Sequence, residues 1–418
     1  MARVRGQQVP RRLAAALGAM VLMATVSACS PSSTVPTAAR RSPPPATGTH
    51  PTTTTSVAPS AAPTTVPTTV PRAPGWSLAL TTLPPGGGFT SLSCLSDTFC
   101  VATGGGNAGG SATPISGSGV AISWDGAVWS SPSVYFPAPA TGTVTAPVLP
   151  TLACTSGPLC VIVDGSGHVS TGDGTNWSDP APLPTTPLLP VNPSDPGTGQ
   201  ADSRTAAIAC PSPSLCAVVD NTGHTYTLKG GAWLAPQSFG QYVGFGTAAS
   251  KVSLYQTGRV GVSCPSVTDC TAVVGTAVLD WNGLVWSQEP KPWTSSLAPD
   301  AAAPVAIACP TTDLCAIVNG DDIVVRDGSK PWTPRQTLDP GRQLDSIACA
   351  SRSFCVAADD TGAIMEWNGS TWTGPTPVVP AATQYTGIGV SVSCPSAQFC
   401  MVMNADGDYA TFDGSASG

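Results

Sequence analysis

Two aspartate–histidine pairs with the same spacing are the residues of this sequence best suited to chemistry: Asp164 with His168, and Asp220 with His224. Further acids occur at comparable places later in the chain, namely Asp321, Asp322, Asp359, Asp360 and Asp406. Carboxylate oxygens bind hard cations and accept hydrogen bonds from sugars, and a neutral imidazole favours a borderline metal over calcium. If these side chains converge, they form a cation or sugar site, and they are our candidate ligand-binding residues.

The same residue types have a second interpretation. Asp, Asn and Gly form tight turns readily, because a short polar side chain bonds to the backbone of its own turn. The sequence leaves both interpretations open and does not indicate a particular metal. It contains no convincing catalytic set of His, Glu and Arg, and we expect no catalytic residue and no cofactor.

Cysteine pairs mark the elements that must position these residues. Fourteen of the 15 cysteines form pairs with five residues between the two members. Zinc sites favour two to four intervening residues and four converging ligands, so we expect disulfides, each contributing about 2 kcal/mol by closing a short loop. The pairs are Cys94/Cys100, Cys154/Cys160, Cys210/Cys216, Cys264/Cys270, Cys309/Cys315, Cys349/Cys355 and Cys394/Cys400.

Each pair belongs to a repeat of 40 to 60 residues. An aliphatic residue and then Ser or Ala precede every first cysteine, which is the alternation of a strand with one large and one small face. The motif Trp-Asp/Asn-Gly-x-x-Trp follows in full at Trp124–Trp129, Trp281–Trp286 and Trp367–Trp372. We interpret this motif as a hairpin turn with aromatic packing.

Four short strands per repeat of this length predict an all-β fold, a seven-bladed β-propeller with four antiparallel strands per blade. Six repeats carry a tryptophan for a fourth strand, and the last repeat lacks one. The seventh tryptophan is Trp76, upstream of the first repeat. We therefore predict that the N-terminal strand around Trp76 completes the last blade and closes the ring.

The N-terminal part has a different composition. Residues 1–28 begin with four arginines and contain an apolar run, which is typical of an export signal. They lead into Val26-Ser27-Ala28-Cys29, which resembles the bacterial lipobox, and this resemblance implies lipidation of Cys29. Residues 29–74 form a Pro/Thr/Ser-rich tract that we predict to be a disordered stalk. The domains are thus a signal peptide (1–28), a lipidated stalk (29–74) and the propeller (75–418).

Charge limits the choice of partner. The chain has a net charge of −7, and all 24 acids lie after residue 75, against 10 basic residues there, so the predicted propeller carries −14. Nucleic acid is excluded as an expected partner, because binding it needs clustered basic charge. We expect a monomer attached to the membrane through the lipid on Cys29.

The cysteine repeat, as in Ile208–Val219 and Val392–Val402, resembles exported repeat lipoproteins of actinobacterial type. The tryptophan motif also distantly resembles the Asp-box of sialidase-type propellers, although its Asp and Gly are adjacent. The first resemblance implies a propeller at the outer leaflet of the cell membrane and implies no activity.

We therefore expect a non-enzymatic binding or scaffold module for cell-wall glycan or an exported protein. The alternative is a glycan-processing propeller enzyme, either sialidase-like or another glycosidase or lyase. The long connections between repeats are expected to carry recognition, with aromatic residues such as Tyr135 and Phe136 in contact with the partner.

Overall fold

The computed structural model describes residues 75–79, 88–105, 119–136, 150–157, 159–164, 167–184, 206–220, 223–239, 260–274, 277–289, 305–383 and 389–414. The chain divides into two units, Met1–Val66 and Pro67–Gly418, and all described residues belong to the second unit. The predicted signal peptide, Cys29 and the stalk lie outside the described residues. No helix in the described ranges has the length and hydropathy needed to cross a bilayer.

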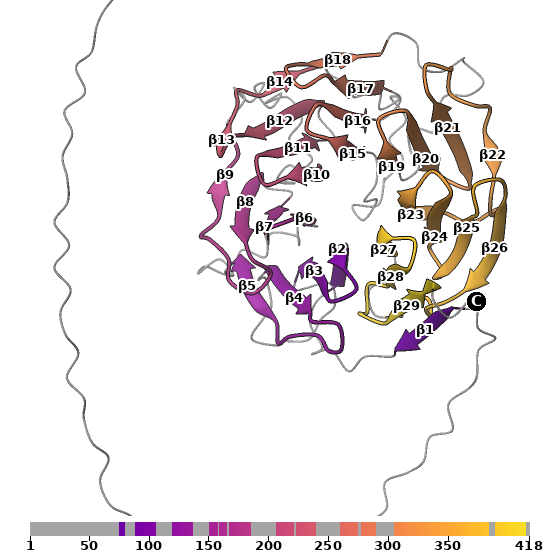
Figure 1. The fold of residues 1–418 in the computed structure, drawn as a ribbon. Helices are drawn as coiled ribbons and strands as arrows, with labels where there is room; N and C mark the ends of the chain where they lie inside the picture. Colours follow the sequence, from indigo (N-terminus) through magenta and orange to yellow (C-terminus); the bar gives the residue numbers. More distant parts are fainter. Residues whose placement is uncertain are drawn as a thin grey trace, which may run out of the picture. The chain divides into compact units, whose positions relative to one another are not determined.

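The described strands form seven antiparallel sheets, which are the blades of a seven-bladed β-propeller (Figure 1). Blade 1 contains β2 (Gly88–Ser96), β3 (Phe99–Gly105), β4 (Gly119–Trp124) and β5 (Ser133–Phe136). Blade 2 contains β6 (Thr151–Thr155), β7 (Leu159–Val163), β8 (His168–Gly172) and β9 (Ala181–Pro182). Blade 3 contains β10 (Ala206–Ser212), β11 (Leu215–Asp220), β12 (His224–Lys229), β13 (Ala232–Trp233) and β14 (Gln237–Ser238).

The remaining blades follow the same order. Blade 4 contains β15 (Val260–Ser266), β16 (Asp269–Val274), β17 (Ala277–Trp281) and β18 (Trp286–Gln288). Blade 5 contains β19 (Val305–Thr311), β20 (Leu314–Asn319), β21 (Asp322–Asp327) and β22 (Gln336–Thr337). Blade 6 contains β23 (Leu344–Ser351), β24 (Phe354–Asp359), β25 (Ala363–Trp367) and β26 (Trp372–Pro377).

Blade 7 confirms the predicted closure of the ring. It contains β27 (Ser391–Ser396), β28 (Phe399–Met403) and β29 (Tyr409–Asp413), and its fourth strand is β1 (Trp76–Ala79) from the N-terminal side. β1 pairs with β29 in the register Trp76↔Phe412, and the two strands lie side by side in Figure 1. Closing the sheet in this way pairs an edge that would otherwise be exposed.

The blades pack on one another through their flat faces. Each innermost strand contacts the innermost strand of the next blade, and β27 contacts β2, so the contacts run around the whole ring. The apolar clusters span neighbouring blades: one of them joins Val356 and Ile364 of blade 6 to Trp76, Val402 and Phe412 of blade 7. The core therefore consists of layers between blades, which is how a chain of this length buries apolar side chains.

The predicted cysteine pairs are all disulfides, and each bridge lies within one blade. Their Cα atoms are 3.9 to 4.1 Å apart. The first strand of blade 6 runs past Cys349 to Ser351, which pairs with Phe354. The bridge from Cys349 to Cys355 thus joins two strands inside the ladder, ahead of the turn.

The second cysteine of each bridge lies on the second strand of its blade, and in five blades this cysteine is completely buried. Cys100, Cys160, Cys216, Cys270 and Cys400 are each 0% exposed. The second strand is flanked by the first and third strands and packs against the neighbouring blades, which buries these cysteines. The disulfide pairing of these cysteines is confirmed, and their role is confined to the core.

In three blades the small residue before the first cysteine is a serine that accepts a hydrogen bond from the neighbouring blade. Ser93 Oγ accepts a hydrogen bond of 3.0 Å from the backbone N–H of Cys154 in the next blade. Ser393 Oγ accepts one of 2.9 Å from Cys94, and Ser263 makes the equivalent contact with the first cysteine of blade 5 at 2.9 Å. These bonds link the innermost strands of adjacent blades.

The Trp-Asp/Asn-Gly-x-x-Trp motif is a turn between the third and fourth strands, with aromatic packing. In blade 1, Asp125 Oδ1 accepts hydrogen bonds of 2.9 Å from the N–H groups of Ala127 and Val128, and Gly126 has φ +99°. The two tryptophans of the motif, Trp124 and Trp129, pack with ring centroids 5.6 Å apart. Positive φ at this position explains the glycine.

Candidate binding face

The two ends of the blades carry different connections. The turns between second and third strands lie at the same end of the blades as the blade-to-blade connections, and we call this end the turn face. The cysteine hairpins and the turns between third and fourth strands lie at the other end, which we call the hairpin face. This follows from the antiparallel order of the strands in each blade. The acids selected from the sequence lie on the turn face.

The first acid of each turn bonds to its own turn. Asp164 Oδ1 accepts a hydrogen bond of 2.7 Å from the N–H of His168, and Asp220 Oδ1 accepts one of 2.9 Å from His224. Asp359 Oδ1 similarly accepts one of 2.8 Å from the N–H four residues further on. These three carboxylates are buried, with 7%, 3% and 1% of their surface exposed. This geometry is what the turn-forming interpretation expects.

The two acids of the blade 5 turn bind different segments. Asp321 Oδ2 accepts a hydrogen bond of 3.2 Å from the N–H of Gly341, in the connection that leads to blade 6. Asp322 Oδ1 accepts one of 2.8 Å from Thr337 Oγ1 on the fourth strand of its own blade, and its Oδ2 lies 3.4 Å from an Arg335 nitrogen. Asp321 therefore attaches the blade-to-blade connection, whereas Asp322 attaches the outer strand of blade 5.

The acids of blades 6 and 7 differ in exposure. Asp406 Oδ2 accepts hydrogen bonds from Thr383, at 2.6 Å from its N–H and 3.0 Å from its Oγ1, and so holds the connection between these blades. The side chain of Asp360 is exposed. Neighbouring turns thus use equivalent acids in different ways.

The two histidines lie beside the aspartates of their own turns. The Nδ1 of His168 is 3.4 Å from Asp164 Oδ2, and the Nδ1 of His224 is 3.4 Å from Asp220 Oδ2. The His168 side chain is 38% exposed and packs against Phe136, with ring centroids 5.6 Å apart. Within the described ranges, no group of three or more His, Cys, Asp and Glu side chains is arranged to hold a metal ion.

A buried carboxyl pair on the turn face was not predicted from the sequence. Asp339, in the connection between blades 5 and 6, is 7% exposed and shares a hydrogen bond with Asp359. Burial, followed by this bond and the repulsion between the two acids, raises the pKa of Asp339 to about 6, while Arg342 opposes the rise.

Asp345, at the start of blade 6, is a half-buried carboxyl that was also missed. Its Oδ2 accepts a hydrogen bond of 3.2 Å from the N–H of Val390, just before β27 of blade 7. Burial raises the pKa of Asp345 to about 7, and repulsion from Asp360 and Asp359 adds to the rise, whereas the bond from Val390 lowers it. Neither Asp339 nor Asp345 occupies a position with an acidic equivalent in other repeats, so the repeat pattern gave no signal for them.

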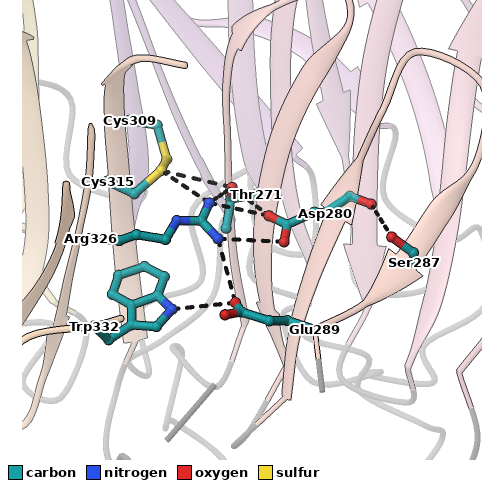
Figure 2. A network of polar contacts seen from close by, with 8 residues as sticks. All are labelled: Thr271, Asp280, Ser287, Glu289, Cys309, Cys315, Arg326 and Trp332. Carbon is teal, nitrogen blue, oxygen red and sulfur yellow. Dashed lines mark hydrogen bonds and ion pairs between the residues drawn. A yellow bond between two sulfur atoms is a disulfide. The ribbon is translucent and has the colours of Figure 1, made fainter. Parts of the chain in front are cut away.

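Arg326 lies in a polar network between blades 4 and 5 (Figure 2). Its guanidinium donates to Thr271 Oγ1 at 2.7 Å, to Asp280 Oδ1 at 3.2 Å and to Glu289 Oε2 at 3.4 Å. The same guanidinium carbon lies 5.1 Å from the ring centroid of Trp332, whose Nε1–H also donates to Glu289. Arg326 and Glu289 are therefore paired with each other between blades 4 and 5.

The place of Arg326 in its blade explains this network. Arg326 pairs with Cys315, whereas in blade 4 the equivalent partner of the second cysteine is Trp281. The arginine thus replaces an inner tryptophan of the repeat. Burial and repulsion from Asp280 raise the pKa of nearby Asp269, and Arg326 opposes this rise.

Two further residues contribute to contacts between blades. Glu366 Oε1 accepts a hydrogen bond of 3.0 Å from Trp76 Nε1. Tyr135 was expected to contact a partner, but it is 4% exposed and packs on Trp177 with ring centroids 6.1 Å apart. Burial also raises the pKa of Tyr135. Both residues serve packing between blades.

No protein-family model matches this chain, and no curated protein matches it in sequence. Solved structures match in fold. The structure of YCF48 bound to a D1 peptide has a TM-score of 0.52 at 15% identity, covering 82% of this chain and 98% of that chain. Virginiamycin B lyase from Staphylococcus aureus has a TM-score of 0.52 at 11% identity, covering 81% and 99%. U3-55K has a TM-score of 0.55 at 10% identity, covering 82% and 100%. At these identities the likeness establishes the propeller fold alone.

Proposed function

We propose that this protein is an exported, lipid-anchored propeller that serves as a non-enzymatic binding or scaffold module. Seven disulfides support an oxidising compartment outside the cytoplasm. Cys29, the one cysteine outside the seven pairs, follows the lipobox-like segment. In this proposal residues 1–28 are a signal peptide, Cys29 carries the lipid, and residues 30–74 hold the propeller away from the outer leaflet of the membrane.

The proposed ligand is an exported polypeptide or a cell-wall glycan, bound at the turn face. One observation carries this proposal: the acids of the turn face fix the connections between blades, as Asp321 does for Gly341 and Asp406 does for Thr383. Connections of variable sequence on a rigid ring are a common arrangement for recognition. The exposed His168 ring and Asp360 carboxylate lie on the same face and complete the proposed ligand-binding set.

Two experiments test the proposal. Membrane partitioning of the full chain and of Cys29→Ser, with mass spectrometry of the mature N-terminus, tests the anchor, and an unmodified mature N-terminus downstream of Cys29 would refute it. Calorimetric titration with soluble peptidoglycan fragments, and separately with an array of peptides from exported proteins, tests the ligand. We expect heat with one class, reduced at least fivefold in affinity by the pair Asp321→Asn and Asp406→Asn and unchanged by Asp179→Asn, an exposed acid of blade 2. Absence of heat with both classes would refute binding at the turn face.

The alternative function is glycan processing, and one observation favours it. The turn face holds a carboxyl, Asp339, with a pKa of about 6 beside the carboxylate of Asp359. Glycoside hydrolysis uses two carboxyl groups, of which the general acid has a raised pKa. Turnover of a peptidoglycan or glycan substrate that is lost in Asp339→Asn, without loss of folding, would support the enzyme; binding without turnover supports the scaffold.

A further inference from the structure

Exposed aliphatic side chains gather on the hairpin face. Among the described residues, seven large apolar side chains are exposed, and four of them lie in turns of this face: Val128, Val267, Leu284 and Val285. Leu284 is 75% exposed, the highest value in this group. The other three lie on outer strands or directly after one, and none lies in a described turn of the turn face. Apolar surface that is concentrated in this way marks an interaction site.

Blade 4 carries three of the four residues. Its turn between the third and fourth strands lies against its cysteine hairpin, because Trp281 Nε1–H donates a hydrogen bond of 3.3 Å to the carbonyl oxygen of Val267. We call Val267, Leu284 and Val285 the apolar tip. One cation lies at its edge: Lys229 of blade 3 is exposed, and its Nζ donates a hydrogen bond of 2.8 Å to the carbonyl oxygen next to Leu284, that of Gly283.

The fold does not require apolar residues in this turn. In blade 6 the equivalent positions hold Ser370 and Thr371 in place of Leu284 and Val285. In both turns an asparagine side chain accepts hydrogen bonds from the two backbone N–H groups of these positions, at 2.9 to 3.0 Å. The same turn thus forms with polar residues, so the apolar tip of blade 4 calls for an explanation outside the turn itself.

Strand order places the N-terminal connection of the propeller on the same face. β29 begins at the turn face and ends at the hairpin face, and β1 pairs with it in antiparallel fashion. The N–H of Asp413, at the end of β29, donates a hydrogen bond of 2.8 Å to the carbonyl oxygen of Gly75. β1 therefore starts at the hairpin face, and the segment that links Cys29 to the propeller is joined to it there.

We propose that the hairpin face docks on a lipid bilayer, with the apolar tip in the membrane interface. The inference rests on the lipid anchor of the proposed function and deepens it by naming the face that meets the membrane. A tether on this face raises the effective concentration of the tip at the bilayer, so a few apolar side chains suffice for contact. Lys229 can extend its ammonium group to a phosphate while its stem stays beside apolar groups. The turn face then points away from the membrane and stays open to the proposed ligand.

Charge determines which lipid surface fits. The propeller carries −14, from 10 basic residues and 24 acids after residue 75. Exposed acids such as Asp125 and Asp173 lie in turns of the hairpin face, where they repel anionic headgroups. The contact is therefore apolar in origin, and a zwitterionic bilayer is the appropriate probe.

Site-specific photocrosslinking in vesicles tests the proposal. The purified, unlipidated full chain is coupled through the thiol of Cys29 to a maleimide phospholipid in phosphatidylcholine vesicles, so attachment does not depend on lipidation in the cell. A photoreactive benzophenone amino acid replaces either Leu284 in the apolar tip or Asp360, an exposed residue of the turn face. After illumination, mass spectrometry measures the yield of phospholipid adducts. We expect at least tenfold more adduct from position 284 than from position 360.

A second set of chains carries the benzophenone in place of Val267 and tests the neighbouring turn. Leu284→Ser combined with Val285→Thr installs the blade 6 residues, so the yield of lipid adduct should fall at least fivefold while the melting temperature is unchanged. Ser370→Ala, in the blade 6 turn, is the matched control and should leave the yield unchanged.

Four results would overturn the proposal: equal yields at positions 284 and 360, no lipid adduct at either, no effect of the double substitution, or crosslinks between two copies of the chain in place of lipid adducts. The last result would assign the apolar tip to a contact between proteins. Failure of the anchor is detected separately, because an unmodified Cys29 in the exporting cell would refute the anchor without changing the adduct yields of the chemically coupled chain.

Discussion

Trp76 donates its indole Nε1–H to Glu366 Oε1 across 3.0 Å, although 290 residues separate the two in sequence. The bond joins the outer strand of blade 7 to the third strand of blade 6. Other seams repeat this arrangement: Trp177 Nε1 donates to Ser133 at 3.1 Å, and Trp286 Nε1 donates to Thr227 at 3.2 Å. A tryptophan of an outer strand therefore anchors its blade to the preceding one.

Trp76 should accordingly contribute strongly to the free energy of unfolding, although it lies near the N-terminal end of the propeller, where a residue often contributes little. It is 2% exposed and packs on Phe412 with ring centroids 5.4 Å apart. Trp76→Phe keeps most of the packing but removes the donor to Glu366, so we expect a loss of about 1–2 kcal/mol; Trp76→Ala should cost about 3–5 kcal/mol. Equilibrium denaturation in guanidinium chloride measures both. A Trp76→Ala midpoint equal to that of the parent would contradict closure by this strand.

The serine that bonds from one inner strand to the next gives a second prediction. Ser93→Ala removes the acceptor for the N–H of Cys154 while changing almost no volume, so stability should fall by about 1 kcal/mol. The matched control is Ala153→Ser, which adds the same hydroxyl to the equivalent position of blade 2 and should not lower stability. Thermal melting of both variants under identical redox conditions measures the two effects. A typical hydrogen bond contributes about 1 kcal/mol net, so a loss below about 0.3 kcal/mol in Ser93→Ala would show that this hydrogen bond does not stabilise the ring.

The network of Arg326 should show strong coupling. Arg326→Met leaves Asp280 and Glu289 without their cation in a partly buried seam, so we expect a loss of about 2 kcal/mol or more. Adding Asp280→Asn should recover part of this loss, because the uncompensated charge is removed. A double-mutant cycle by chemical denaturation measures the coupling. Strictly additive effects would show that these groups do not stabilise one another.

Stability should rise on mild acidification. The pKa values of Asp339 and Asp345 are raised to about 6 and about 7 in the folded state, against about 3.9 in an unfolded chain. Between about pH 4 and 7 the folded protein therefore binds more protons, so its stability decreases as the pH rises through this window. Below about pH 4 the acids with lowered pKa values, such as Asp125 and Asp327, oppose the trend.

The melting temperature should thus be higher at pH 5 than at pH 8. Asp345→Asn keeps an acceptor for the N–H of Val390 and removes the titration, so the difference between the two pH values should shrink in this variant. Asp179→Asn serves as the exposed control and should leave the difference unchanged. Scanning calorimetry across this range provides the measurement, and a parent protein that is equally stable at both pH values would contradict the assignment.

The sequence was sufficient for the features that repeat. The spacing of the cysteines predicted the seven disulfides. The count of tryptophans predicted that Trp76 completes the last blade, because each of the other blades has one tryptophan for its fourth strand. Spacing did not distinguish the two cysteines of a bridge, whereas in the structure second cysteines such as Cys100 and Cys400 have no exposed surface. The bond between Glu366 and Trp76 could not be predicted, because the two residues are 290 apart in sequence and no local pattern points from one to the other.

The candidate site was harder to predict than the fold. Asp164 and Asp220 were identified as notable residues, but whether an aspartate bonds to its own turn or faces a ligand depends on burial, which the spacing does not encode. Asp339 and Asp345 were missed because their raised pKa values arise from burial between blades and from neighbours on separate segments. The role of Arg326 could not be predicted for the same reason. It takes the position of a tryptophan in the repeat, and its partners Asp280 and Glu289 lie on other segments of the chain.

The pairing of β1 with β29 also means that the ring can close only after the last blade has been synthesised. Each disulfide joins residues only six apart in sequence, so a hairpin can form its bridge as soon as it is made. β1 is synthesised before every blade, yet its partner strand ends at Asp413. The growing chain must therefore carry Trp76 unpaired through the synthesis of all seven repeats, and any factor that shields this segment would govern how many chains complete the ring.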